Sequence, residues 1–352
     1  MHDTRKVRTG IIGCGNIART HAHALATLEE SEFTAVCDAE RARAQTVADA
    51  HRVPHVFTNP REMLQSGLIE AVTICVPHPL HAEMGIMAAQ AGVHAIVEKP
   101  LTVSLREADA MIAAHRRAGT NLACIFQRRF WPAAQRLRRA IDEGKLGDHL
   151  VMGDCIVKWW RSAAYYQADP WRGRWDTEGG GVLVNQAVHA IDMYQWYMGP
   201  VDTIYAQMGT FTHEIEVEDN AVATLRFTSG ALGVIQASVS HSPTLWSRIT
   251  VLGANGAAAS VLEQPEGNMA RNDIWTIPGE EHLPEQWWAQ EQDTRSFPTH
   301  HVLQIQDFLR AIVEDREPAV TGAEGRKAVE IILAIYQSAR TGEPVRLPLP
   351  VD

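Results

Sequence analysis

The chain has 352 residues, of which 45% are hydrophobic and 21% are charged, a composition typical of a soluble globular protein. This length exceeds one ordinary core and predicts about two domains. A formal net charge of -10, with a pI near 5.9, argues against nucleic acid and anionic membranes as partners, because proteins that bind them gather Lys and Arg. The basic stretch 128–139 is the local exception. We interpret residues 132–143, which overlap this stretch, as a helix. Its arginines are expected to form a solvated face rather than a phosphate-binding track.

The cysteines indicate a reducing compartment. There are five of them, at positions 14, 37, 75, 124 and 155, an odd number without a Cys-x-x-Cys pair, so we expect neither a disulfide framework nor a metal site. The N-terminus lacks the apolar stretch of a secretory signal, and no run of about 18 apolar residues suggests a membrane span. We therefore expect a cytoplasmic protein without a membrane segment.

The first 125 residues alternate short, apolar, β-rich runs with amphipathic helical stretches. Strands are predicted at 7–12, 33–37, 71–75, 94–97 and 121–125, and helices at 17–28, 41–51, 80–91 and 105–118. Repeated βα units of this kind build a parallel sheet with helices on both faces. Residues 1–126 are therefore predicted to form a doubly wound, Rossmann-type α/β domain.

The pattern changes in the remainder of the chain. Two hairpins are predicted, one pairing 219–228 with 231–240 around Ser229-Gly230 and one pairing 248–252 with 257–262 around Asn255-Gly256. Helices are predicted at 187–198, 301–313 and 324–341. Residues 127–352 therefore predict an α+β domain with an open, mainly antiparallel sheet. The segment 263–298, which carries Trp275, Trp287 and Trp288, is predicted to be a lid or an oligomer contact.

A glycine-rich run joins the first predicted strand to the first predicted helix. In this run Gly13 allows a tight turn, Gly15 allows a pyrophosphate to approach the backbone, and Ala18 takes the place of the third glycine of the Gly-x-Gly-x-x-Gly pattern. Because the run lies between a strand and a helix, it predicts a dinucleotide site rather than an ordinary turn. The backbone candidates for the cofactor are Gly13, Gly15, Asn16 and Ile17.

Asp38, at the end of the second predicted strand, indicates which dinucleotide is used. It follows Gly15 by 23 residues, where a carboxylate accepts hydrogen bonds from the ribose hydroxyls. A carboxylate there repels a 2′-phosphate, so NAD is favoured over NADP. Arg41 lies close enough in sequence to weaken this preference, so NADP is less favoured but not excluded.

Two further loops leave the carboxyl ends of predicted strands, where such sheets bind ligands. In the first, Pro77, His78 and His81 are candidates to line the cofactor, although His81 could equally be a helix-start residue packed on the loop. In the second, Glu98-Lys99-Pro100, Glu98 and Lys99 are candidates to contact the cofactor. There Lys99 would face a cationic nicotinamide and act as a proton shuttle or as a donor that orients an alcohol; the alternative is a surface lysine.

A second candidate centre follows the glycines at 179–181. Asn185 and His189 lie four residues apart in a predicted helix, a spacing that places both side chains on one face. Histidine, with an ordinary pKa near 6.5, is a suitable base near neutral pH. The alternative is a buried helix histidine bonded to the backbone.

Aromatic and arginine residues concentrate at 158–166 and 170–175. Aromatic rings stack on the apolar faces of pyranoses, and guanidinium groups bind hydroxyls or carboxylates, so these segments predict a sugar-shaped ligand; the alternative is that the tryptophans pack a domain boundary. Gln127 is a further candidate for the cofactor. The substrate candidates beyond Lys99, Asn185 and His189 are Arg128, Tyr165, Arg172, Gln186 and His301.

These motifs, in this order and at these distances, resemble those of the glucose-fructose oxidoreductase/inositol dehydrogenase/MocA (Gfo/Idh/MocA) family over nearly the whole chain. The resemblance implies that Lys99 matches the family lysine and His189 the catalytic histidine, and that Trp171 and Arg172 pack near the nicotinamide. It also implies that the open sheet of the second domain forms a homodimer or homotetramer. Asn185 departs from the family, which usually has aspartate there, so any mechanism that needs a charge at this position is in doubt.

The resemblance implies an NAD-dependent dehydrogenase that oxidises a secondary hydroxyl of a pyranose sugar or glycoside, C3 being our preferred carbon. His189 would take the hydroxyl proton, Lys99 would stabilise the developing alkoxide and Asn185 would orient the reacting groups; the roles of Lys99 and His189 could be exchanged. Three alternatives remain open: a nucleotide-sugar (uronic acid) or inositol dehydrogenase, an NAD-dependent enzyme that cleaves glycosides through a transient 3-keto sugar, and an NAD-sensing regulator, which the presence of both Lys99 and His189 disfavours.

Overall fold

The computed structural model describes residues 5–265, 269–290 and 298–350. The chain divides into two compact units, the first formed by residues 1–127 and 298–326 and the second by residues 128–297 and 327–352. The sequence-based division assigned all residues from 127 onward to one domain. The structure instead groups residues 298–326 with the N-terminal part of the chain.

The first unit is built on a parallel sheet, which confirms the predicted Rossmann fold. In the described residues the sheet has six strands in the order β3-β2-β1-β4-β5-β6, and every neighbouring pair is parallel. The strands are β1 (Val7–Ile12), β2 (Ser31–Cys37), β3 (His55–Phe57), β4 (Ala71–Ile74), β5 (His94–Val97) and β6 (Leu122–Cys124). The chain order reverses between β1 and β4, and ligands of such sheets bind at the carboxyl ends of the strands near this point.

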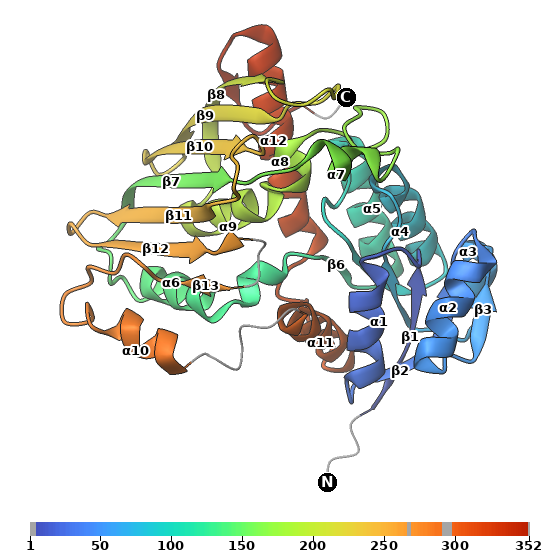
Figure 1. Ribbon diagram of the computed structural model, residues 1–352. Helices are drawn as coiled ribbons and strands as arrows, with labels where there is room; N and C mark the ends of the chain where they lie inside the picture. The colour runs from blue at the N-terminus through green and yellow to red at the C-terminus, as the bar shows by residue number, and fades with distance from the viewer. Residues whose placement is uncertain (1–4, 266–268, 291–297, 351–352) are drawn as a thin grey trace. The chain divides into compact units, whose positions relative to one another are not determined.

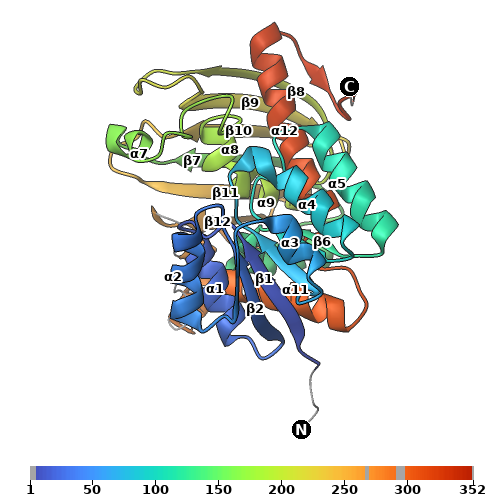
Figure 2. The same cartoon turned by 90° about the vertical axis from the view of Figure 1, so that its right-hand side faces the viewer.

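Four helices in the N-terminal part of the first unit agree closely with the sequence prediction. They are α1 (Ala18–Thr27), α2 (Arg41–His51), α4 (His81–Gln90) and α5 (Leu105–Ala118); Figure 2 shows α1 and α2 beside β1 and β2. The end of α5 illustrates why its limits were predictable. Basic residues occupy its last turn and Gly119 follows in the left-handed conformation, both common signals of a helix C-terminus. The sequence prediction missed β3 and α3 (Pro60–Gln65), which are short.

Helix α11 (Thr299–Val313) joins the first unit although it lies far along the chain. Its apolar stripe of Ile305, Phe308, Leu309 and Ile312 has helical spacing and is buried in one core with residues of α1, among them Ala22 and Leu25. Figure 1 shows the two helices side by side. The side-chain amide of Gln304 also forms two hydrogen bonds with the backbone at the end of β6. It accepts from Phe126 N at 3.0 Å and donates to Cys124 O at 2.8 Å. Packing of α11 therefore completes the Rossmann core.

The second unit has a mainly antiparallel sheet, as predicted. Among the described residues it contains eight strands in the order β13-β12-β11-β7-β10-β9-β8-β14, and β7 with β10 is its one parallel pair. Figure 1 shows β8, β9, β10, β7, β11 and β12 stacked one below another. The strands are β7 (Leu150–Lys158), β8 (Val201–Gly209), β9 (Asn220–Phe227), β10 (Leu232–Ser238), β11 (Trp246–Gly253), β12 (Ala258–Glu263), β13 (Ala270–Arg271) and β14 (Val345–Arg346). Both predicted hairpins, β9/β10 and β11/β12, are confirmed. Strands β7 and β8 were not predicted.

One face of this sheet is exposed. Met152, Val222 and Leu232 are each about half exposed, and the register of β7, β9 and β10 places them on the same side. The other side is covered by helices, since α6 (Pro132–Asp142) contacts β12 and β13 and α9 (Val188–Met198) contacts β7 and β11. Helix α12 (Gly322–Thr341) runs from the first unit into the second. No helix within the described residues is both long and apolar enough to cross a membrane.

The predicted single helix through Asn185 and His189 is wrong. The structure has two helices, α8 (Val182–Asn185) and α9, with a break at Gln186 and Ala187. At the break the Ala187 N–H donates to Val182 O, five residues back, at 2.8 Å, so the turn is wider than in an α-helix. The i,i+4 argument that placed the two side chains on one helix face therefore does not apply.

The segment 263–298 contains regular structure in its described part. Strand β13 and helix α10 (Leu283–Gln290) lie within it, while residues 266–268 and 291–297 are outside the described residues. The rings of Trp275 and Trp287 pack edge to face with centroids 5.1 Å apart, and the Arg136 guanidinium stacks on Trp287. These tryptophans pack their own unit; the lid or oligomer contact stays a prediction.

The helix predicted at 132–143 is confirmed as α6, and its arginines, Arg136, Arg138 and Arg139, are partly or fully exposed. The two arginines of the basic stretch that precede α6 are not part of this solvated face. Arg139 is exposed, but Arg128 and Arg129 are buried. Arg128 pairs with Glu263 at 2.6 Å, and Arg129 pairs with Asp192 through two bonds of 2.7 and 2.6 Å. Each guanidinium needs a buried carboxylate partner because an unpaired buried charge is very unfavourable.

The Arg129–Asp192 pair predicts a large effect on stability. Asp192→Ala leaves a buried guanidinium without its carboxylate, so we expect the free energy of unfolding in urea to fall by about 3–5 kcal/mol. The matched control is Asp142→Ala, which breaks the exposed Arg138–Asp142 pair on α6 and should cost about 0–1 kcal/mol. Equal losses in the two variants would contradict the assignment.

Candidate active site

The loop between β1 and α1 has the shape that a dinucleotide requires. Gly13 has a φ of +90°, and a Cβ atom on it would lie 2.6 Å from the carbonyl oxygen of Cys75, so only glycine fits there. A Cβ atom on Gly15 would meet nothing within 4 Å, so this side of the loop is open. Asn16 and Ile17 lead directly into the N-terminus of α1, where backbone N–H groups and the helix dipole favour a phosphate group.

Asp38 is held against this loop at the end of β2. Its Oδ2 accepts from Cys14 N at 2.7 Å and its Oδ1 accepts from Glu40 N at 2.8 Å. A carboxylate has about four acceptor positions, so both oxygens keep capacity for ribose hydroxyls. Arg41 begins α2 beside it and is exposed. The glycine loop and Asp38 therefore fit NAD, and the preference over NADP stays a prediction from the Asp38 charge.

His81 connects two loops at the carboxyl edge of the sheet. It is fully buried, and its ring nitrogens lie 2.8 Å from Pro100 O and 3.0 Å from Val76 O. Burial lowers its pKa. His78, in the turn that follows Pro77, packs edge to face on the His81 ring. This geometry favours the alternative that His81 is a helix-start residue packed on the loop.

The Glu98-Lys99-Pro100 turn rests on a buried ion pair that the sequence prediction missed. Glu98 Oε1 lies 2.8 Å from Nε2 of His21, a fully buried residue of α1, and Glu98 Oε2 accepts from Lys99 N at 3.1 Å. Burial opposes ionisation of both groups, but the partners outweigh it. Cys75 and Glu98 raise the pKa of His21, whereas His21, His301 and Lys99 lower the pKa of Glu98 to about 2. Glu98 therefore holds the turn that carries Lys99.

Two other residues that the sequence predicted for the site, His301 and Gln127, lie in the same unit as the His21–Glu98 pair. His301, which we expected to contact substrate, is buried on α11 with its ring 6.2 Å from that of His21. Gln127 follows β6, and its amide oxygen is buried without a hydrogen-bond donor among the described residues. An unsatisfied buried acceptor at the carboxyl edge of the sheet is consistent with a ligand-binding role.

In the second unit, Asn185 belongs to a compact hydrogen-bond cluster. Its Nδ2 donates to Glu178 Oε1 at 2.5 Å and to the Tyr165 hydroxyl at 3.2 Å, and Gln186 Nε2 donates to the same hydroxyl at 3.2 Å. Sequence reasoning named Tyr165, Asn185 and Gln186 but missed Glu178. No motif marks Glu178, since its importance depends on the fold of the loop that carries it.

Arginines flank the Tyr165 ring. The Arg172 guanidinium lies 3.9 Å from the ring centroid and that of Arg161 lies 4.9 Å from it. Arg172 also stacks near Trp171 and pairs with Asp169 at 2.9 Å. These predicted residues therefore gather around one phenol ring, whereas Arg128 is committed to Glu263 and does not join them.

His189 lies in the first turn of α9 and is buried.

The glycine run before α8 is held by Glu218, which accepts from Gly181 N and Leu183 N at 2.9 Å each and from the Tyr336 hydroxyl at 2.9 Å. Burial raises the pKa of Glu218 to about 7, against the opposing effect of these hydrogen bonds. A Cβ atom on Gly181 would overlap Glu218 O, so this close approach requires glycine.

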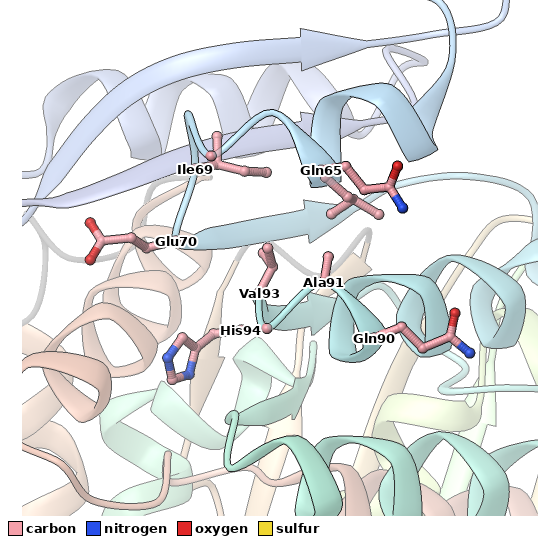
Figure 3. Close-up of a pocket in the computed structure, with 10 residues that line it drawn as sticks. Gln65, Ile69, Glu70, Gln90, Ala91, Val93 and His94 are labelled. Carbon is pink, nitrogen blue, oxygen red and sulfur yellow. The ribbon is translucent and has the colours of Figure 1, made fainter.

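A hollow in the first unit is unrelated to these residues. It is lined by Gln65, Glu70, Gln90, His94 and their neighbours, as Figure 3 shows. Glu70 and His94 stand at the beginnings of β4 and β5, so the hollow lies at the edge opposite the glycine loop. In the part of the chain that the structure describes, no group of three His, Cys, Asp or Glu side chains could hold a metal ion.

Comparison with known proteins agrees with this architecture. Residues 7–126 match the model of an oxidoreductase family with an NAD-binding Rossmann fold, and residues 134–259 match the GFO/IDH/MocA C-terminal domain. The crystal structure of the WlbA dehydrogenase from Bordetella pertussis, in complex with NADH and UDP-GlcNAcA, is 32% identical with a TM-score of 0.86, and the match covers 98% of this chain and 100% of that one. The chain belongs to the Gfo/Idh/MocA family. It is an oxidoreductase, and residues 7–126 form its NAD-binding Rossmann domain.

Other members of the family are named as dehydrogenases of sugars or cyclitols. The myo-inositol 2-dehydrogenase of Thermotoga maritima is 28% identical over 97% of this chain and 98% of its own length. The D-glucoside 3-dehydrogenase of Escherichia coli is 25% identical over 97% of each chain. The family resemblance inferred from the motifs is therefore confirmed, while the individual roles of the site residues stay predictions.

The glycine loop generates a test that separates folding from cofactor binding. Gly15→Ala adds a methyl group on the open side of the loop, so we expect an unchanged melting temperature and an NAD affinity at least about tenfold lower, a loss of about 1.4 kcal/mol. Gly13→Ala should lower both quantities because its methyl group meets backbone. Fluorescence titration with NADH and thermal unfolding measure the two effects. Normal NADH affinity in Gly15→Ala would contradict this placement of the cofactor.

Proposed function

We propose that this enzyme oxidises a secondary hydroxyl, with C3 as the preferred carbon, of a pyranose sugar or glycoside. The observation that carries the proposal is the cluster of Tyr165, Asn185 and Gln186 in the second unit. Sugar hydroxyls both donate and accept hydrogen bonds, and amides and phenols provide both functions without a fixed charge. The aromatic and guanidinium groups of Trp171 and Arg172 beside this cluster suit the apolar face and the rim of a sugar ring.

The chemistry is divided among three side chains. His189 takes the hydroxyl proton, Lys99 donates to the reacting oxygen as it becomes an alkoxide, and Asn185 orients the hydroxyl or the imidazole. NAD, held by the glycine loop and Asp38, would supply the acceptor for the hydride that leaves the carbon. Glu98 holds the turn from which Lys99 projects, and Glu218 holds the glycines that precede α8. The D-glucoside 3-dehydrogenase relative supports C3 as the carbon.

A second candidate substrate is a nucleotide-linked uronic acid. It is favoured by the identity of 32% to the WlbA dehydrogenase, whose structure contains UDP-GlcNAcA, and by a second WlbA structure, from Chromobacterium violaceum, at 29% with a TM-score of 0.87. Arg161 and Arg172, both close to Tyr165, provide guanidinium groups that could bind a carboxylate in a fork geometry.

A substrate panel tests this function. NADH formation is measured with free sugars, glycosides, cyclitols and nucleotide-linked uronic acids, and we expect turnover with a pyranoside and loss of at least about a hundredfold in kcat for His189→Ala. Turnover confined to cyclitols would reject the pyranose assignment. Release of an aglycone without accumulation of NADH would indicate bond cleavage instead, and near-native kcat in His189→Ala would reject the role of the histidine.

We further propose that the exposed face of the second unit's sheet joins two or more copies of the chain into a homodimer or homotetramer. Apolar side chains exposed in a cluster mark interaction surfaces, and Met152 and Leu232 are direct neighbours on β7 and β10. The double variant Met152→Glu/Leu232→Glu should therefore lower the mass measured by light scattering. Leu303→Glu, an exposed leucine on α11, is the control and should leave the mass unchanged.

A further inference from the structure

Glu178 is a buried carboxylate that the motifs do not mark. It is 1% exposed, and it lies between the Trp171–Trp175 loop and the glycines that precede α8. Its Oε2 accepts from Gly173 N at 2.6 Å and its Oε1 accepts from Asn185 Nδ2 at 2.5 Å. Short bonds to an ionised acceptor are among the strongest in proteins, so Glu178 ties the aromatic loop to Asn185.

The carboxylate determines which end of the Asn185 amide faces it. An ionised carboxylate can only accept hydrogen bonds, so it selects the nitrogen of the amide and rejects the oxygen. The second N–H of the same nitrogen points to the Tyr165 hydroxyl at 3.2 Å. Both N–H groups are thus directed to Glu178 and Tyr165, and Asn185 presents its Oδ1 as an acceptor.

The orientation of Asn185 also determines what Tyr165 can do. The Tyr165 hydroxyl accepts from Asn185 Nδ2 and from Gln186 Nε2, and the Arg161 side chain also hydrogen-bonds to it, so its acceptor capacity is engaged. Its own O–H group is then a donor. Asn185 therefore contributes an acceptor and Tyr165 a donor, which is the complementary pair that a sugar hydroxyl needs.

We propose that Glu178 is a positioning residue of the substrate site: it carries the negative charge next to a neutral Asn185 and fixes the orientation of the amide, with the nitrogen toward the carboxylate and the oxygen away from it. The functional part of this proposal rests on the sugar-dehydrogenase activity proposed above. The orientation of the amide does not, and it can be measured separately.

The charge around Glu178 is balanced by its neighbours. The titratable and charged groups that face it or its partner Tyr165 come from α7 (Ala163–Gln167), the loops on either side of α7, and α12, and they are Arg161, Tyr165, Tyr166, Arg172 and Tyr336. Beyond these lie Glu218, which bonds to Tyr336, and His213 and Asp219 near Tyr166. A second negative charge at position 185 would therefore meet Glu178 directly.

Two single variants and their combination test the proposal. In Glu178→Gln the side-chain amide no longer selects the nitrogen of Asn185, so we expect kcat to fall by about tenfold to a hundredfold while the KM for NAD is unchanged. In Asn185→Asp two carboxylates share one proton, so activity should fall on the alkaline side of the pH profile, where that proton is lost. Glu178→Gln/Asn185→Asp has one carboxylate again and should lose the new alkaline limb.

The matched control is Asp176→Asn, which removes an exposed carboxylate from the same loop and should keep wild-type kcat and pH dependence. Thermal unfolding checks the fold of each variant; should Glu178→Gln fail to fold, the pH profile of Asn185→Asp decides, because that variant keeps the Glu178–Gly173 bond. A kcat within twofold of wild type in Glu178→Gln, or an unchanged pH profile in Asn185→Asp, would overturn the positioning role.

An activity-independent measurement separates this proposal from the proposed function. With selective ¹⁵N labelling of asparagine, one side-chain Hδ2 signal of the wild type should be shifted downfield by its short bond to a carboxylate, and Glu178→Gln should abolish that shift. Absence of such a signal in the wild type rejects the amide orientation. If the signal is present but the substrate panel yields no NADH, the proposed function fails while the Glu178–Asn185 bond stands.

Discussion

A carboxylate that is removed from water must find donors, and here the donors belong to the loops that carry the site. Asp38, which is partly exposed, accepts from the backbone of the glycine loop, and the buried Glu98 pairs with His21 and bonds to the backbone of Lys99. In the second unit Glu178 accepts a hydrogen bond from the backbone of the Trp171–Trp175 loop. Glu218 accepts one from the backbone of the glycines at 179–181. Each loop is thereby tied to its own unit, which keeps flexible, glycine-containing segments in one conformation.

Glu178 also provides a physical account of the neutral asparagine at position 185, where the family resemblance implies an aspartate. The negative charge is not lost from this part of the molecule, because Glu178 bonds directly to the Asn185 amide. A second carboxylate at that distance would force the pair to share a proton. The Asn185–Glu178 combination keeps one charge and adds a fixed amide.

The elements that were predicted well are those whose signals are local. Strand β1, helix α2 and helix α5 have the predicted bounds, because their apolar periodicity and terminal residues lie within the segment itself. The break between α8 and α9 was not predictable in this way. It depends on a hydrogen bond between Ala187 and Val182 and on Glu218, which comes from a distant part of the chain and holds the start of α8.

The amino-acid sequence by itself determined the family, the Rossmann domain and the candidate groups Asp38, Lys99, Asn185 and His189, because glycine spacing and βα alternation are properties of neighbouring residues. Only the tertiary structure decided that α11 completes the first core, that Arg128 pairs with Glu263, that His21 pairs with Glu98 in the first unit, and that Glu178 bonds to Asn185 in the second. Each of these pairings joins residues from separate segments, and the cost of burying an unpaired charge or polar group is what selects the partner.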